Sequence, residues 1–194
     1  VASGANSNLN PSDIPPELFD PERFGILLLQ LEIPLETVIH AATRACECGI
    51  KVILNPAPAC ALPDQLLKCI WLATPNEIEA EALSGVHIDD QPSAAKAAEV
   101  LHSKGIRNVI ITLGETGAFI SSGSYKGLVP GIHVKAVDTT AAGDIFNGAI
   151  AVALAEGKPI EEAAAFANRA AAISVTRMGA QASAPFRQEL DENS

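Results

Sequence analysis

The chain has 194 residues, of which 48% are hydrophobic, 19% charged and 4% aromatic, a balance that excludes a disordered chain, a collagen and a coiled coil. With 13 Lys and Arg against 23 Asp and Glu, the net charge of −10 has the wrong sign for a nucleic-acid partner. No apolar run approaches the roughly 18 residues that cross a bilayer, and no basic segment precedes an apolar one at the N-terminus, so we expect a cytoplasmic protein with no membrane partner.

Short apolar runs alternate with amphipathic helices in the first part of the chain. Four runs are long enough for strands but too short for helices: residues 25–31, 51–54, 70–72 and 108–113. Helical patterns lie between them, at residues 34–47, 77–83 and 93–104. We expect Ser93 to cap the third helix and Gly105 to end it. This alternation predicts an α/β fold, with a mostly parallel sheet flanked by helices.

The pattern changes after residue 117. Residues 118–122 and 125–129 predict a small antiparallel hairpin, and a short strand is expected at residues 133–137. Two alanine-rich helices follow, one at about residues 143–156 and one that begins after Pro159 and runs to about residue 176. We predict one domain over residues 1–188 and an unstructured tail over residues 189–194.

Residues 138–144, Asp-Thr-Thr-Ala-Ala-Gly-Asp, lie between a predicted strand and a long helix. Small residues let a ligand approach the backbone, and the first amides of a helix offer unpaired donors and a partial positive charge, which together favour an anion. A carboxylate at Asp144 would then accept a proton from a hydroxyl beside that anion. A turn that only caps the helix has the same spacing, so the pattern leaves both interpretations open.

Other nucleotide-binding and hydrolytic motifs are missing from the sequence. It contains no G-x-x-x-x-G-K-[ST], no G-x-G-x-x-G and no G-x-S-x-G. The glycine pair Gly114 and Gly117 is equally typical of a turn after a strand. A P-loop protein, a Rossmann dinucleotide site and a serine hydrolase are therefore excluded.

Residues 138–148, Asp-Thr-Thr-Ala-Ala-Gly-Asp-Ile-Phe-Asn-Gly, resemble the second signature of the ribokinase-like sugar kinases, the phosphofructokinase B type. The segment Asn55-Pro-Ala-Pro-Ala59 resembles the ribokinase branch of that family rather than fructokinases or adenosine kinases. Four further segments agree in order: Ser3-Gly-Ala-Asn6, Leu29-Gln-Leu-Glu32, Thr74-Pro-Asn-Glu-Ile-Glu79 and Val175-Thr-Arg-Met-Gly-Ala-Gln181. The resemblance covers essentially the whole chain.

The resemblance implies ATP-dependent phosphorylation of ribose at O5, with magnesium and potassium as cofactors. A kinase-derived module that binds nucleotide or a partner without turnover is the alternative. The only methionine is Met178 and no family Gly-Gly signature is present, so we expect the C-terminal part of a larger enzyme, truncated before the sugar-binding and lid region. Such a truncation would leave an open sheet edge near residues 1–5 or 25–31, where a homodimer could pair.

The same resemblance assigns roles to individual residues. The amides of Ala141, Ala142 and Gly143 would hold the transferred phosphate, Asp144 would be the catalytic base, and Glu32 would contact the sugar. The residues matching the nucleotide and magnesium site are Asn76, Glu79, Thr112, Gly114, Gly117 and Asn168. The residues matching the potassium site are Asp138, Thr140, Ser174, Arg177, Gly179 and Ser183.

Three of these residues have simpler explanations that the sequence leaves open. Glu32 fits a solvated charge at a strand end, and Asn76 fits the N-cap of the helix that begins beside it. Arg177 fits a cation at a helix C-terminus, where the helix dipole favours positive charge.

Overall fold

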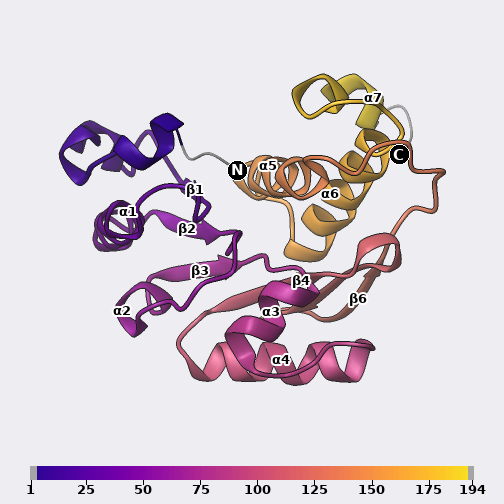
Figure 1. The fold of residues 1–194 in the computed structure, drawn as a ribbon, viewed down its shortest axis with the longest axis horizontal. Coiled ribbons are helices and arrows are strands. Elements are labelled where there is room, and N and C mark those ends of the chain that lie inside the picture. The colour runs from indigo at the N-terminus through magenta and orange to yellow at the C-terminus, as the bar shows by residue number, and fades with distance from the viewer. Residues whose placement is uncertain (1–3, 192–194) are drawn as a thin grey trace.

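The computed structural model describes residues 4–191, which form three layers with a sheet between two layers of helices (Figure 1). Six strands lie in chain order: β1 Ile26–Leu29, β2 Lys51–Leu54, β3 Ile70–Ala73, β4 Asn108–Thr112, β5 Gly117–Ser121 and β6 Lys126–Pro130. β1 to β4 pair in parallel, whereas β5 pairs antiparallel with both β4 and β6. The predicted α/β class, the parallel sheet and the hairpin are confirmed.

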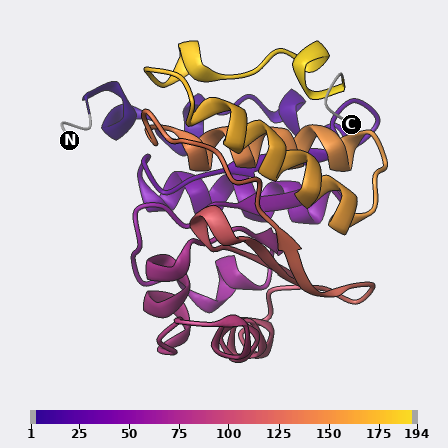
Figure 2. The same cartoon turned by 90° about the vertical axis from the view of Figure 1, so that its right-hand side faces the viewer.

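Two groups of helices cover the two faces of the sheet. α1 Leu35–Glu47, α3 Glu77–Ser84 and α4 Gln91–Ser103 pack on one face. α5 Ala142–Ala155 and α6 Ile160–Ser174 pack together on the other, as Figure 2 shows. The shorter elements are α2 Asp64–Leu67, α7 Arg187–Asp191 and the 3-10 turns Gly4–Asn8, Pro11–Asp13, Pro16–Phe19, Gly114–Thr116 and Gln181–Ser183.

The inner strands β2 to β5 are buried on both faces because their side chains alternate between two cores. In β2, Val52 and Leu54 join the core under α1 and α4, whereas Ile53 joins the core under α5 and α6. This double burial explains why the strands appear in the sequence as continuous apolar runs. Alanines at the buried faces of α4 and α6 bring these helices close to the sheet without large side chains in between.

α4 begins two residues earlier than its amphipathic pattern predicts. Asp90, not Ser93, is its N-cap: the Asp90 carboxylate accepts a bond of 2.8 Å from the Ser93 amide, and the Ser93 hydroxyl accepts one of 3.0 Å from the Asp90 amide. Pro92 is compatible with this start because the first turn of a helix needs no amide donor from it. The expected cap at Ser93 is therefore wrong, since Ser93 is the third residue of the capping box.

The predicted strand at residues 133–137 is wrong. This segment has a strand-like alternation, but it crosses from β6 toward α5 as irregular chain. Its end bonds to a loop rather than to a strand: the amides of Val137 and Asp138 both donate to the carbonyl of Val175, at 2.7 and 3.1 Å. The edge strand β6 directly precedes this segment, but the segment does not pair with it, so alternation alone does not make a strand.

The predicted unstructured tail does not begin at Glu189. This residue lies within α7, where its carboxylate forms an ion pair with Arg177 and accepts a 2.8 Å bond from the amide of Phe186. Arg187 adds contacts, since its guanidinium pairs with Glu156 and lies 5.2 Å from the centre of the Phe166 ring. These long-range contacts keep the segment helical. Residues 192–194 of the predicted tail lie outside the described part of the chain.

The open sheet edge expected at residues 25–31 is present. Within residues 4–191, β1 pairs with β2 alone, and Leu28 in its centre is 38% exposed. At the other expected edge, Gly4 and Ala5 lie in a 3-10 turn, and residues 1–3 lie outside the described residues. Among the helices of residues 4–191, none is long and apolar enough to cross a membrane.

Candidate active site

Polar side chains gather at one edge of the sheet, where β1 to β4 end. Gln30 follows β1, Asn55 follows β2 and Thr74 follows β3, whereas Thr112 is the last residue of β4. The carboxyl ends of parallel strands share one edge of a sheet, and that edge is the usual ligand site of open α/β folds. The first two turns of α5 reach the same edge, because Asn147 bonds to Thr74 and Asp144 bonds to Gln30.

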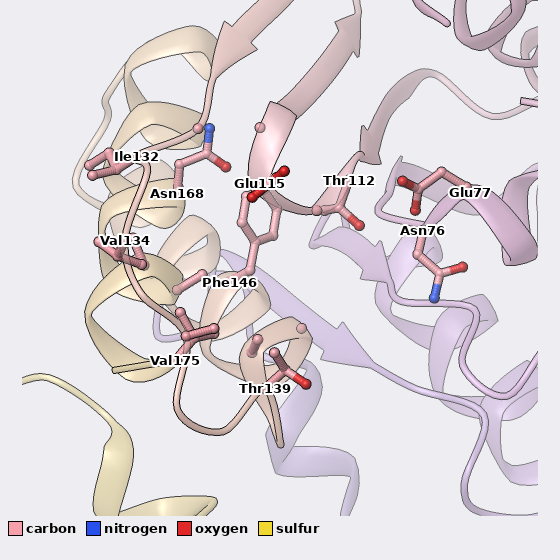
Figure 3. Close-up of a pocket in the computed structure, with 18 residues that line it drawn as sticks. Asn76, Glu77, Thr112, Glu115, Ile132, Val134, Thr139, Phe146, Asn168 and Val175 are labelled. Carbon is pink, nitrogen blue, oxygen red and sulfur yellow. The ribbon is translucent and has the colours of Figure 1, made fainter. Parts of the chain in front are cut away.

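A cavity of about 390 Å³ lies between the start of α3, the β4–β5 turn, the start of α5 and α6 (Figure 3). Two of its sides differ in character. Asn76, Glu77 and Thr112 line one side, and Ile132, Val134 and Val175 face them with apolar side chains from the other. Seven of the predicted site residues line this cavity together: Asn76, Thr112, Gly114, Gly117, Ala142, Gly143 and Asn168.

The apolar side of the cavity was not anticipated from the sequence. The ring of Phe146 projects between Thr112 and Asn168 (Figure 3), although Phe146 belongs to the same signature segment as the predicted loop. The irregular segment that contains Ile132 and Val134 closes the side near α6. Asn168 is buried there, and its amide nitrogen donates to the carbonyls of Val129 and Pro130 at 3.2 and 3.1 Å. An apolar wall with a few converging polar groups is the common form of a small-molecule site.

The loop before α5 has a backbone suited to an anion. Ala141 is the N-cap of α5, adopts a left-handed φ of +61° and gives the helix no side-chain cap. This conformation costs a non-glycine residue roughly 1–2 kcal/mol. No side chain caps the first turn, so the Gly143 amide is open to an external acceptor, whereas the Ala142 amide donates to the Thr139 carbonyl at 3.2 Å. Ala142 and Gly143 both line the cavity.

Asp144 lies on the other side of this loop. Its carboxylate accepts a hydrogen bond from the side-chain amide of Gln30, and together with Ala141 it borders a second cavity of about 540 Å³. The loop therefore presents amides to one cavity and a carboxylate to the next. Gln30 was not predicted; its only sequence signal is its place in the same Leu-Gln-Leu-Glu segment as Glu32. Glu32 itself is exposed in the bend after β1.

Asn76 and Glu79 form the capping box of α3. The Asn76 side-chain oxygen accepts from the Glu79 amide at 2.8 Å, and the Glu79 carboxylate accepts from the backbone and side-chain nitrogens of Asn76 at 2.9 and 3.1 Å. The N-cap role of Asn76 is thus confirmed. Burial raises the pKa of Glu79, and the bond from the Asn76 backbone opposes that rise. Glu77, rather than Glu79, lines the cavity.

Three of the predicted potassium-site residues meet at one carboxylate. Asp138 accepts bonds of 2.9 Å from the amides of Thr140 and Gly179, one on each oxygen. Hydrogen bonds from the Thr140 side chain, the Gly179 backbone and the Thr140 backbone lower the pKa of Asp138 from 3.8 to about 2. Asp138 therefore connects the loop before α5 at residues 138–143, which we call the anion loop, to the loop that follows α6.

The other three predicted potassium-site residues turn elsewhere. The hydroxyl of Ser174 donates to the Ala171 carbonyl at 2.8 Å, and the hydroxyl of Ser183 donates to the Ala180 carbonyl at 2.7 Å. The guanidinium of Arg177 pairs with Glu189. If these residues serve a cation site, they do so through backbone carbonyls.

The sequence profile of the pfkB family carbohydrate kinases matches residues 4–187. The chain belongs to the pfkB family of carbohydrate kinases. A ribokinase of Haemophilus influenzae is 51% identical over 99% of the chain and 63% of its own length. The crystal structure of ribokinase from Thermotoga maritima superposes with a TM-score of 0.88 at 45% identity, over 98% of the chain and 62% of that structure.

A third pfkB relative carries ligands. Arabidopsis thaliana ribokinase complexed with ribose and ATP superposes with a TM-score of 0.83 at 35% identity, over 87% of the chain and 55% of that structure. The chain thus spans less than two thirds of the length of these relatives.

The two glycines predicted for the nucleotide site, Gly114 and Gly117, differ in how tightly they are packed. A Cβ on Gly117, where φ is +114°, would lie 2.2 Å from the Val129 carbonyl oxygen and 2.3 Å from the Gly131 nitrogen. Gly114 also has a positive φ, +55°, but a Cβ there would meet nothing within 4 Å. Gly117 is therefore required by the close approach of β5 to the end of β6, and Gly114 only by its backbone conformation.

Gly117→Ala is expected to lower the free energy of unfolding by about 2–4 kcal/mol, because the methyl group overlaps backbone that cannot rotate away. Gly114→Ala is the matched control and should cost about 1 kcal/mol, from the left-handed conformation alone. Urea denaturation followed by circular dichroism measures both. Equal midpoints for the two variants would contradict the difference in packing.

Proposed function

We propose that the chain is the nucleotide-binding and base-bearing part of an enzyme that phosphorylates ribose at O5 with ATP. The observation that carries this proposal is the start of α5, which presents the backbone at Ala142 and Gly143 to the first cavity and holds the Asp144 carboxylate beside Gln30 at the end of β1. Transfer of a phosphoryl group needs donors for the phosphate and a base for the attacking hydroxyl, placed next to each other.

The first cavity suits the nucleotide. Its apolar side at Val134 and Phe146 offers a flat surface to the adenine ring, and Thr112, Gly114 and Asn168 border the same space. With the adenine ring there, the triphosphate would extend toward Ala142 and Gly143, where the N-terminus of α5 favours the transferred phosphate. The pfkB relationship and the relative complexed with ribose and ATP support this assignment.

The sugar is assigned to the other side of the loop. Asp144 would take the proton from the primary hydroxyl while that hydroxyl attacks the phosphate. Gln30 holds the Asp144 carboxylate from the end of β1, and Glu32 follows in the next bend, where the family resemblance places a sugar contact.

The acidic residues fit magnesium as an ion that arrives with the triphosphate. Both oxygens of the Glu79 carboxylate already accept hydrogen bonds from Asn76, so Asn76 and Glu79 suit contact through water better than direct ligation. The ion supplies positive charge to the phosphates. Within residues 4–191, no group of three His, Cys, Asp or Glu side chains gathers to hold a metal by itself, which agrees with this division.

We also propose a cytoplasmic location, because the phosphoryl donor is ATP, and a homodimer of the 194-residue chain that pairs through the open edge at β1. The edge presents unpaired backbone groups, and such edges are usually covered in a finished assembly. The mass of the particle in solution, measured by light scattering, tests the dimer.

The test of function uses the full-length enzyme, by which we mean this chain extended to the length of its relatives. ADP release is followed in a coupled assay with ribose, 2-deoxyribose and fructose as acceptors. We expect ribose to give the highest kcat/KM. ATP binding without turnover on any sugar would favour the alternative, a kinase-derived module that only binds nucleotide or a partner.

Potassium is expected to activate the full-length enzyme relative to sodium. Asp138 joins the anion loop to the loop at Gly179, and its three hydrogen-bond donors leave the carboxylate one lone pair for a cation. Asp138, the backbone of Thr140 and the carbonyls near Ser174, Arg177 and Ser183 would hold the ion. Initial rates in potassium-free sodium buffer and in potassium buffer measure the effect, and equal rates would refute it. Asp138→Asn should remove the response to potassium.

This potassium response should be independent of pH from about pH 5 to about pH 9, because Asp138 stays ionised throughout. The pKa of Asp138 in the folded chain, about 2, lies below its ordinary value of 3.8. Its contribution to stability is therefore complete above 3.8 and is lost as the pH falls toward 2. An activation that titrated with an apparent pKa near 6 would point to a different group.

A further inference from the structure

A chain of buried polar side chains runs beneath the loop between the two cavities. Asn147 on α5 is 3% exposed, Thr74 after β3 is 1% exposed and Asn55 after β2 is 8% exposed. A buried polar group destabilises the fold unless it is hydrogen-bonded. Each of these three residues bonds to the next, so together they connect β2, β3 and α5 at the site edge.

Asn147 holds the first turn of α5 from below. Its amide nitrogen donates to the Gly143 carbonyl at 2.8 Å, and its side-chain oxygen accepts from the Thr74 hydroxyl at 2.5 Å. A carbonyl only accepts hydrogen bonds, so the group that faces Gly143 must be the NH₂ group. The side-chain oxygen must then face Thr74, whose hydroxyl donates. This orientation leaves Asn147 no second arrangement of equal energy.

Thr74 connects this bond to the other half of the site. The next residues are Pro75 and Asn76, the start of the capping box that borders the first cavity. The carbonyl of Thr74 accepts 2.9 Å from the Asn55 side chain, and its amide donates to Leu54 at 3.0 Å, so its backbone is fixed. The Thr74 hydroxyl lies 3.4 Å from the Leu54 carbonyl, which makes Asn147 the closer partner.

We propose that Asn147, through Thr74, is a positioning residue that fixes the anion loop at Ala142 and Gly143 relative to the capping box at Asn76. The inference rests on the proposed function, because it specifies how the loop is placed to receive the terminal phosphate of ATP. The amides of the first helical turn move with the Gly143 peptide, which Asn147 bonds directly. Loosening that bond releases the phosphate donors and leaves the adenine side of the cavity in place.

The test compares the affinities of ATP and ADP for the 194-residue chain, by calorimetric titration with magnesium present. The affinity for ATP divided by the affinity for ADP measures the contribution of the terminal phosphate to binding. Thr74→Val keeps the shape of the side chain but removes the hydroxyl donor, and we expect it to lower the ratio by on the order of tenfold. ADP should bind within about twofold of its original affinity. Thr74→Ser keeps the hydroxyl and should retain the original ratio.

Two further variants separate positioning from general stability. Asn147→Ala removes both bonds and should lower the ATP to ADP ratio as Thr74→Val does. Thr37→Val is the control: Thr37 is as buried as Thr74, and its hydroxyl donates to the Leu9 carbonyl at 2.7 Å on the other face of the sheet. It should lower the melting temperature and leave the ratio unchanged.

An unchanged ratio in both Thr74→Val and Asn147→Ala would overturn the inference while the proposed function stands. Equal weakening of ATP and ADP would also overturn it, because that result indicates a structural role alone. If the original chain bound neither nucleotide, the proposed function would fail and the inference with it.

Discussion

Asp144→Asn is expected to slow phosphoryl transfer in the full-length enzyme by about 10²- to 10⁴-fold, the usual effect of losing a general base. The amide preserves the size of the side chain but cannot accept the hydroxyl proton. ATP affinity should stay within about twofold, because the nucleotide cavity is bordered by Ala142 and Gly143 and not by Asp144. Single-turnover kinetics and calorimetry measure the two quantities separately.

Two variants accompany that experiment. Asp64→Asn changes an exposed aspartate in the first turn of α2 and serves as the matched control, with no expected loss of rate. Gln30→Ala removes the hydrogen-bond donor to Asp144 and should lower kcat by on the order of tenfold, with KM for ATP unchanged. If Asp144→Asn kept more than half of the original kcat, with chemistry rate-limiting, Asp144 would not be the base.

The 194-residue chain by itself is expected to bind ATP and to phosphorylate ribose at least about 10³-fold more slowly than the full-length enzyme. Holding both reactants in line contributes up to about 7–11 kcal/mol to such reactions. The chain spans 63% of its Haemophilus influenzae relative, and within residues 4–191 we assign only Glu32, Asp144 and the supporting Gln30 to the sugar side. The second cavity, which Asp144 borders, is lined by α5, α6 and residues 180–190 and by neither Gln30 nor Glu32. The nucleotide side, by contrast, is bordered by a formed cavity of about 390 Å³.

Titration with ATP and magnesium, paired with an ADP assay at saturating ribose, measures both parts of this expectation. The full-length enzyme at equal concentration is the reference. A ribose-dependent turnover near 10 s⁻¹, roughly the median for enzymes, would show that the 194 residues suffice. A lack of ATP binding would contradict the placement of the nucleotide.

Local patterns predicted the sheet and the helices well, because their residues bury regular faces. The runs at β2 and β4 match the observed strands to within one residue at each end. The segment at residues 133–137 has a strand-like alternation, but it leaves the edge strand β6 without pairing to it, and its end bonds to the Val175 carbonyl. That path is set by the tertiary fold and cannot be recognised in five consecutive residues.

The site was predictable where one short segment holds several of its parts. The residues of the loop at 138–144 appear together in the sequence, and the structure brings them to one edge with Asn76, Thr112 and Asn168. Gln30 escaped notice because its partner Asp144 lies 114 residues away, and the Thr74 and Asn147 pair is separated by 73 residues. Side chains that act through long-range hydrogen bonds carry no local spacing to recognise.

The two backbone hydrogen bonds that the Asp138 carboxylate accepts have a consequence for regulation. One carboxylate joins the segment before α5 to the segment after α6, so an event that orders one segment also helps to order the other. If a monovalent cation binds there and raises the affinity for ATP by some factor, thermodynamic linkage requires ATP to raise the affinity for the cation by the same factor. The nucleotide and the cation would then act as mutual effectors, and the occupancy of this site would follow the energy charge of the cell as well as its ionic composition.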